Sequence, residues 1–412
     1  MIQFEKFNLA NGLRVIVHED RSVPFVCVNI LYDVGARDES PDKTGFAHLF
    51  EHLMFGGSVN IPNYDEPLQR VGAENNAFTT NDITNYYLTI PENNLETAFW
   101  LESDRMLSLA FSDTSLDVQR NVVIEEFKQR YLNQPYGDVW LLLRPLAYKV
   151  HPYQWSTIGK EISHIENAKM EDVKAFFHRF YCPNNAIMVV GGNVGLEQVK
   201  KLSEKWFGPI PKGSENRRKL PMEPPQTEER ILTVQRDVPL DAIYKVYHMC
   251  SRTEKEYYTM DIISDILSRG NSSRLYKELL KKQKIFSDIN AYLTGDYDNG
   301  LFVISGKLVK GVSMQDANAS IEAEVEKIKS EIVNEKELTK VKNKMESTLV
   351  FSEMDIMNKS TNLAIYELLG DAALINKEVD HYLSVTPSQI KEQANKVFTK
   401  NNCSTLYYMS KK

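Results

Sequence analysis

The sequence predicts an α+β protein made of two homologous halves, each a mostly antiparallel sheet packed with helices on one face. One pattern recurs along the chain. In residues 171–190 an amphipathic helix leads through an Asn-Asn turn into an apolar strand, and residues 388–408 repeat that order. The two copies keep a constant offset of 217 residues, as from Asn185 to Asn402. A duplicated unit of about half the chain explains this offset.

A proline-rich and charged stretch marks the boundary between the two halves. Residues 211–228 have the composition of an extended surface linker. We therefore expect residues 1–210 to form an N-terminal α+β domain and residues 229–412 to form a C-terminal one.

Each half begins with strand patterns and continues with long helices. The expected strand regions are residues 15–32 and 231–249, and the expected helices of the second half include residues 315–333 and 337–369. Both helices are amphipathic and rich in charge, which suits packing on one face of a sheet.

Composition excludes several classes of function. The 412 residues are enough for two or more domains with substantial cores. A net charge of −7 argues against binding to nucleic acid or anionic membranes as the main activity. The four cysteines, Cys27, Cys182, Cys250 and Cys403, are scattered and indicate single buried thiols. The first residues lack the pattern of a secretory or transit signal, so we expect a cytoplasmic protein.

The residues His48, Glu51 and His52 form an H-x-x-E-H motif within an apolar run. On a helix, positions four apart share a face, so the two histidines can bind one metal ion. Glu51 then lies beside that ion, as in a metal-dependent hydrolase. The alternative is a chance pair of core or surface histidines. It is less favoured, because polar side chains among apolar neighbours are costly to bury without a partner.

A catalytic zinc usually takes three protein ligands and keeps a fourth position for water. The best candidates for the third ligand are Glu125 and Glu126, in a long helical stretch. They are adjacent, so only one of them can face the metal. The residues alone leave the choice open, and an ordinary solvated helix face explains them as well.

With these residues the chain resembles the pitrilysin–insulinase family of zinc peptidases, in particular its short bacterial and mitochondrial-processing-type members. The resemblance covers nearly the whole chain. Besides the metal motif, it rests on residues 7–17, 35–39, 44–47, 72–86, 151–153, 158–159 and 272–275.

The resemblance implies a set of roles. The third ligand falls on Glu126, with Glu125 as its outward neighbour, and Glu51 is the general base. The second half has no H-x-x-E-H motif, so one Zn²⁺ per chain is expected. In the family the Asn76-Ala77 step pairs with the substrate backbone as an added strand, which requires extended or unfolded peptides. A plain strand edge is the alternative interpretation of that segment.

The chain departs from the family in one respect. Single-chain members carry an Arg and a Tyr in the second half that contact the substrate carbonyl opposite the zinc. Here Leu280 and Ser287 stand at those positions, and neither can replace the missing donors. We infer that a related partner chain supplies the pair. The alternatives are a self-sufficient homodimeric peptidase and a non-catalytic structural or assembly subunit of the same fold.

Overall fold

The computed structural model describes residues 1–215 and 218–411, which form two compact units. Unit 1 contains Met1–Gln129, Trp155–Leu220 and Val350–Lys377, and unit 2 contains Arg130–Gln154, Pro221–Leu349 and Glu378–Lys412. Asn216 and Arg217, within the predicted linker, lie outside the described residues.

The units do not follow the predicted boundaries at 210 and 229. Residues 130–154 of the first half belong to unit 2, and residues 350–377 of the second half belong to unit 1. The predicted helix 337–369 is correspondingly two helices, because Asp355 begins a new one by accepting a hydrogen bond from the backbone N–H of Asn358.

Unit 1 is built on a six-stranded sheet with the strand order β1-β2-β6-β3-β5-β4. Its strands are β1 (Glu5–Asn8), β2 (Arg14–Glu19), β3 (Phe25–Tyr32), β4 (Glu74–Thr79), β5 (Thr84–Pro91) and β6 (Ala186–Gly192). Only the β2–β6 pair is parallel, so the sheet is mostly antiparallel, as predicted. β4 forms one edge of this sheet.

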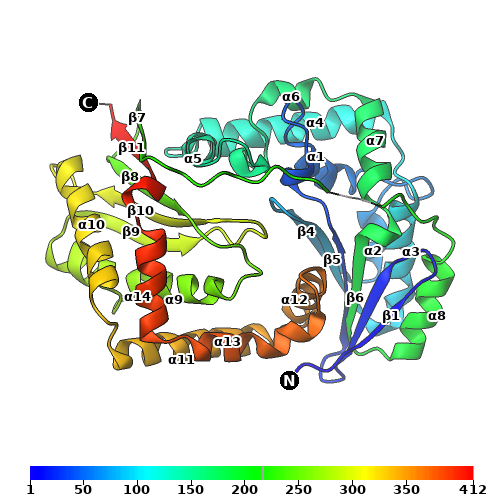
Figure 1. Cartoon of the computed structure of the whole chain (residues 1–412). Coiled ribbons are helices and arrows are strands. Elements are labelled where there is room, and N and C mark those ends of the chain that lie inside the picture. The colour runs from blue at the N-terminus through cyan, green and yellow to red at the C-terminus, as the bar shows by residue number, and fades with distance from the viewer. Residues whose placement is uncertain (216–217, 412) are drawn as a thin grey trace. The chain divides into compact units, whose positions relative to one another are not determined.

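Helices cover both faces of the unit 1 sheet (Figure 1). They are α1 (Phe46–Leu53), α2 (Asp65–Arg70), α3 (Leu95–Leu107), α4 (Asp113–Phe127), α6 (Ile162–Glu166), α7 (Met170–Phe180), α8 (Leu196–Trp206) and α12 (Ile356–Leu368). On one face Tyr86 packs against Phe55, just beyond α1. On the other face Asn29 bonds to Thr361 of α12. Because successive strand residues point to opposite faces, α12 covers the face away from α1.

Unit 2 has a five-stranded sheet with the order β7-β11-β8-β10-β9. Its strands are β7 (Arg230–Arg236), β8 (Ala242–His248), β9 (Phe286–Leu293), β10 (Leu301–Leu308) and β11 (Cys403–Ser410). Its helices are α5 (Val139–Ala147), α9 (Glu256–Ser268), α10 (Met314–Ser330), α11 (Glu335–Ser352), α13 (Glu378–Ser384) and α14 (Pro387–Val397). One apolar core lies between the sheet and the helices α9, α10 and α14, and a second joins its other face to α5.

The predicted duplication is confirmed by the two sheets. α7 leads through a short turn into β6, and α14 leads through a similar turn into β11. β6 pairs in parallel with β2 and antiparallel with β3, and β11 pairs in the same way with β7 and β8. The α+β class and the two related halves are therefore as expected. The sequence did not predict one feature: the second face of each sheet is covered by a helix from the other half of the sequence. This helix is α12 in unit 1 and α5 in unit 2.

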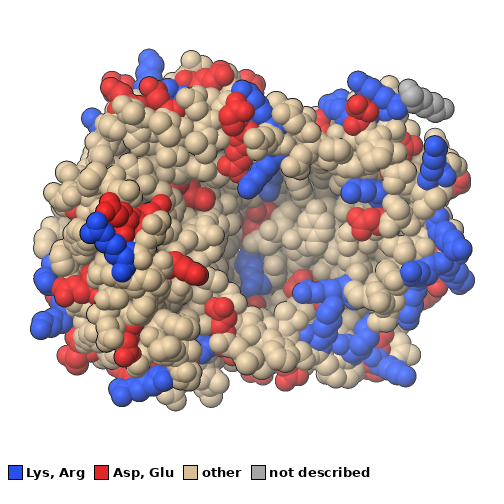
Figure 2. All heavy atoms as spheres, turned by 180° about the vertical axis from the view of Figure 1, so that it is seen from behind, with Lys and Arg blue, Asp and Glu red and all other residues tan. Residues whose placement is uncertain are grey.

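Charged side chains of both signs are interspersed over the face shown in Figure 2. Among the helices of the described residues, none combines the length and the apolar character needed to cross a membrane.

Candidate metal centre

Helix α1 carries the H-x-x-E-H motif on one stripe of its surface. The opposite stripe is apolar and buried, and consists of Phe46, Ala47, Leu49, Phe50 and Leu53. The remaining residues His48, Glu51 and His52 are half-buried. The two imidazole rings lie one helical turn apart, with their centroids 4.9 Å from each other.

The start of α1 is fixed by two neighbouring contacts. Gly45 has φ of +89°, and a Cβ there would lie 2.7 Å from the carbonyl oxygen of Ile158, so only glycine fits. The buried Glu39 carboxylate accepts hydrogen bonds from the backbone N–H groups of Gly45 (2.9 Å) and Ala47 (2.8 Å). Burial raises the pKa of Glu39, although these two hydrogen bonds oppose the shift. Its oxygens satisfy donors that a helix start leaves unpaired.

Glu126 comes from α4, which begins after Ser112, whose hydroxyl accepts a hydrogen bond from the backbone N–H of Ser115. Glu126 is the last residue but one of the helix and is half-buried. Its neighbour Glu125 is exposed and pairs with Lys128 at 2.7 Å. Glu125 is thus the outward member of the pair, as the resemblance implied.

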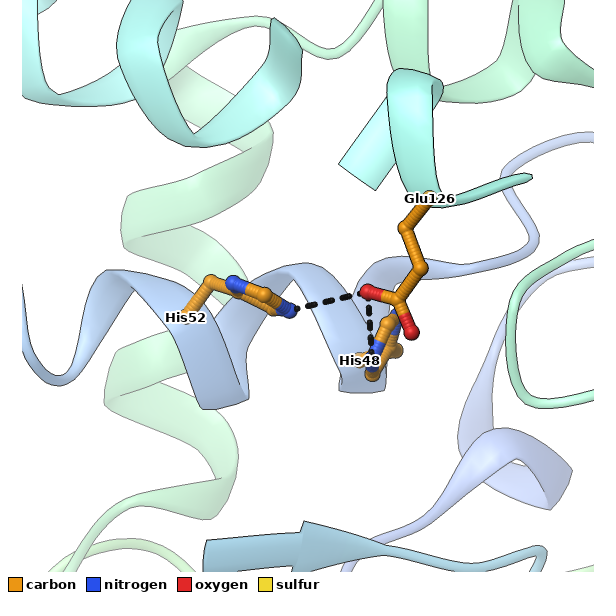
Figure 3. A group of neighbouring side chains, drawn as sticks. All are labelled: His48, His52 and Glu126. Atoms are coloured by element: carbon orange, nitrogen blue, oxygen red, sulfur yellow. Dashed lines mark ion pairs between the residues drawn. The ribbon is translucent and has the colours of Figure 1, made fainter. Parts of the chain in front are cut away.

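The structure brings the three predicted ligands together (Figure 3). The Oε2 atom of Glu126 lies 3.4 Å from Nε2 of His52 and 3.7 Å from Nε2 of His48. Within the described part of the chain, this is the one group of three potential ligands whose donor atoms all lie within 4.8 Å of one another. Their role as ligands stays a prediction.

These distances can be compared with the requirements of a zinc ion. Nitrogen and oxygen ligands bind zinc at about 2.0–2.2 Å, so neighbouring ligand atoms of a tetrahedral site are about 3.4 Å apart. The two separations from Glu126 are close to that value. Two imidazoles and one carboxylate are also a known donor set of catalytic zinc sites. The three residues therefore fit a zinc ion with one position left for water.

The edge strand β4 lies next to this group. Glu51 accepts a hydrogen bond of 2.5 Å from the hydroxyl of Thr79, the last residue of β4. In the turn that follows, the N–H of Thr80 bonds to the carbonyl of Ile83, so this pair is hydrogen-bonded across the hairpin. Antiparallel pairs alternate, so Ala77 and Thr79 direct their backbone N–H and C=O groups away from β5.

The predicted substrate residues occupy this edge. Asn76 faces Tyr87 and Ala77 faces Tyr86 in the ladder with β5. The outward N–H of Ala77 bonds to the side-chain Oδ1 of Asn76 at 2.8 Å. The edge thus carries a backbone donor that bonds to the side chain of the preceding residue. Substrate binding there stays a prediction.

At the two positions where the chain departs from the family, both in unit 2, neither side chain can take the place of the Arg or the Tyr as a donor to a substrate carbonyl. Leu280 packs against the apolar core, and the hydroxyl of Ser287 donates to the backbone carbonyl of Lys307. His151, in a family-like segment, is buried and lies 3.3 Å from Asp298.

Two residues at the site had no assigned role from the sequence. Glu39 and Thr79 stand in segments that carry the family resemblance, but nothing in the spacing indicated their contacts. Both act through tertiary hydrogen bonds, and Thr79 lies 28 residues from Glu51 in the chain. A pattern confined to one helix has no signal for such contacts.

Comparisons with known proteins agree with this architecture. Residues 14–158 match the family model described as insulinase (peptidase family M16), and residues 167–345 match the model described as peptidase M16 inactive domain. The zinc protease PqqE of Helicobacter pylori is 29% identical over 409 residues, which cover 98% of this chain and 92% of that protein.

Solved structures share the fold over almost the full chain. A protease from Helicobacter pylori has a TM-score of 0.93 at 28% identity, with 99% of this chain and 100% of that chain covered. The periplasmic protease PqqL from Escherichia coli has a TM-score of 0.79 at 19% identity. That match covers 98% of this chain but 47% of PqqL. From its two family matches and these relatives, the chain belongs to the pitrilysin–insulinase family of peptidases, peptidase family M16.

Proposed function

We propose that this chain is a zinc-dependent endopeptidase that hydrolyses extended or unfolded peptides. The observation that carries the proposal is the convergence of Glu126 on both histidines of α1, with separations that match neighbouring zinc ligands. The similarity to a protein named zinc protease supports the choice of metal. His48, His52 and Glu126 would hold one Zn²⁺ per chain.

In the proposed chemistry the metal ion and Glu51 have different roles. When bound, zinc lowers the pKa of a coordinated water towards neutrality and polarises the scissile carbonyl. Glu51 lies on the same stripe of α1 as the two histidines, but its proposed role is to transfer a proton and not to bind the metal. Its carboxylate accepts the proton of the attacking water and later delivers it to the leaving amine.

The proposed substrate follows from the edge strand. The outward backbone groups of Ala77 and Thr79 can pair with a peptide that adds a strand to β4. Such pairing is insensitive to side-chain identity but needs an extended backbone. In this account, Asn76 releases the N–H of Ala77 when the peptide binds. A folded protein with no free strand would be a poor substrate.

We further propose that the chain works with a related partner chain. Two observations support this arrangement. Leu280 and Ser287 replace the Arg and Tyr that the resemblance led us to expect, and neither side chain can stabilise a developing oxyanion through a cation or a phenol. In addition, the chain matches only 47% of PqqL, so one PqqL chain is about twice as long as this protein. A homodimer is the competing arrangement.

The test measures metal content and peptide cleavage on the same samples. The wild-type protein should contain one zinc ion and, in the active assembly, cleave an unstructured fluorogenic peptide. Glu51→Gln should keep the zinc and lose most turnover, since only the proton acceptor is removed. Glu125→Gln is the matched control and should retain both. A Glu51→Gln variant that cleaves like the wild type would contradict the proposal.

The partner is tested separately with the same peptide. We expect weak cleavage by the purified chain alone and strong cleavage after addition of a homologous chain that carries the Arg/Tyr pair. Full activity of the chain alone, with a dimeric mass in solution, would favour the homodimer. Zinc content without cleavage in either sample would favour the non-catalytic subunit.

A further inference from the structure

The hydroxyl of Thr79 donates a hydrogen bond to the Oε2 atom of Glu51 at 2.5 Å. Both side chains are half-buried. A hydroxyl bonded to a carboxylate is a charge-assisted contact, roughly twice as strong as one between neutral groups. A glutamate side chain has three rotatable torsions, so a fixed donor at its end restricts where the carboxylate can point.

Thr79 also belongs to the strand that we expect to bind the substrate. Its side chain points to the α1 face, while its backbone N–H and C=O point away from β5 along the edge. One residue therefore reaches Glu51 with its hydroxyl and the free edge with its backbone. Any peptide aligned on that edge is placed relative to the Glu51 carboxylate through Thr79.

The second half of the chain offers an internal comparison. Its edge strand β9 repeats the Asn-Ala dipeptide as Asn290-Ala291. The residue two positions after the alanine is Leu293 there and Thr79 in β4. The half that lacks the H-x-x-E-H motif thus also lacks this hydroxyl. This difference agrees with a role of the hydroxyl beside Glu51.

We propose that Thr79 is a positioning residue: its hydroxyl holds the Glu51 carboxylate in register with a peptide bound along β4. The inference rests on the proposed function, because it assigns Glu51 the role of proton acceptor. It predicts that loss of the hydroxyl slows the chemical step but does not weaken peptide binding. The backbone pairing of Thr79 does not depend on its side chain.

The test compares isosteric variants of two adjacent threonines. Thr79→Val removes the hydroxyl at constant shape and should lower kcat roughly 10- to 100-fold, as expected for a misplaced catalytic group, with KM and zinc content unchanged. Thr79→Ser keeps the hydroxyl and should restore most of the rate. Thr80→Val is the matched control. The Thr80 hydroxyl bonds to turn N–H groups of Asp82 and Ile83, so its loss should affect stability rather than kcat.

A double-mutant cycle separates positioning from a general structural effect. If Thr79 acts through Glu51, adding Thr79→Val to Glu51→Gln should cause no further loss of the residual rate. A crystal structure of Thr79→Val should show the Glu51 carboxylate in a different rotamer. Three results would overturn the inference: a Thr79→Val variant as fast as the wild type, equal defects in the Val and Ser variants, or additive losses in the cycle. The proposed function itself fails differently, since Glu51→Gln alone would then remain active.

Discussion

Nε2 of His52 lies 3.4 Å from Oε2 of Glu126, although the two residues belong to different helices and are 74 positions apart in the sequence. This contact joins α4 to α1 at the only stripe of α1 that carries polar side chains. A metal ion bound there would be held by side chains of two helices, which are rigid elements. Because the stripe is half-buried, solvent and substrate could still reach the ion.

The start of α1 can be tested through Glu39. Replacing Glu39 with Ala leaves the buried N–H groups of Gly45 and Ala47 without their acceptor. We expect a loss of about 1–3 kcal/mol in the free energy of unfolding and weaker zinc binding. Urea unfolding followed by tryptophan fluorescence measures the first, since Trp100, Trp155 and Trp206 all lie in unit 1.

The control for this change is Glu197→Ala, which removes an exposed carboxylate that pairs with Lys200 on the same helix. It should change stability by less than about 0.5 kcal/mol. Equal effects of the two substitutions would show that Glu39 does not fix α1.

The docking of α12 should depend on pH through Asp20. A hydrogen bond from Lys359 of α12, at 2.7 Å, and a second from Ser22 lower the pKa of Asp20 well below its ordinary value. A lowered carboxyl pKa adds stability above the unfolded-state pKa, near pH 4, and this stability is lost as the pH falls towards the folded-state pKa.

Comparison of the wild type with Asp20→Asn isolates this contribution from other carboxylates. Between about pH 5 and pH 7 the wild type should be more stable by about 1–2 kcal/mol, and the difference should shrink below about pH 4. Urea unfolding at a series of pH values is the measurement. A difference that stays constant down to pH 3 would rule out the ionised pair as its source.

The packing of α12, a helix from the second half of the sequence, on the sheet of unit 1 can be tested with fragments. A fragment of residues 1–228 lacks α12, so the sheet face around Asn29 and Gly191 would be open to water. In the full chain Ile356 and Ser360 of α12 lie against Gly191, and Thr361 bonds to Asn29. The buried residues of α12 are Ile356, Ser360, Leu363, Ala364 and Tyr366. We expect the fragment to unfold without a cooperative transition and to recover one when a peptide of residues 350–377 is added. Cooperative unfolding of the fragment alone, by circular dichroism, would instead support the linear domain boundaries.

Peptide binding at β4 can be tested with two proline substitutions. Ala77→Pro removes an N–H that points away from β5, whereas Asn76→Pro removes one that the ladder uses. The first should raise KM about 2- to 10-fold, the value of one hydrogen bond, with little change in melting temperature. The second should lower the melting temperature. An Ala77→Pro variant with unchanged KM would place the substrate elsewhere.

The sequence allowed a prediction of the fold class and the H-x-x-E-H helix, because both depend on local patterns. The duplication could be predicted because one pattern recurs at a constant offset of 217 residues. The choice of Glu126 over Glu125 needed the family resemblance. The burial of Val123, Ile124 and Phe127 sets which side of α4 faces inward and leaves Glu125 on the outer side. The role of Glu126 as a ligand stays a prediction.

Other features could not be predicted, for a common physical reason. The amphipathic pattern of residues 356–368 shows which side of a helix is buried but not which sheet buries it. It therefore does not predict that α12, from the second half of the sequence, packs on the sheet of unit 1. The contact between Thr79 and Glu51 joins segments 28 residues apart in the same way. The bonds of Glu39 to Gly45 and Ala47 are closer in the chain but depend on the path of the intervening loop. The cytoplasmic location stays a prediction from the sequence.

The central claim is that Glu126 completes a metal site with His48 and His52. The most direct test is elemental analysis of zinc in Glu126→Gln and Glu125→Gln after dialysis against a weak chelator. The two substitutions are chemically identical and lie at adjacent positions of α4. They differ in surroundings, because Glu126 is half-buried beside the histidines whereas Glu125 is exposed and pairs with Lys128. We predict one zinc ion per chain in the wild type and in Glu125→Gln, and little zinc in Glu126→Gln. Full zinc content in Glu126→Gln, or its loss in Glu125→Gln, would contradict the account.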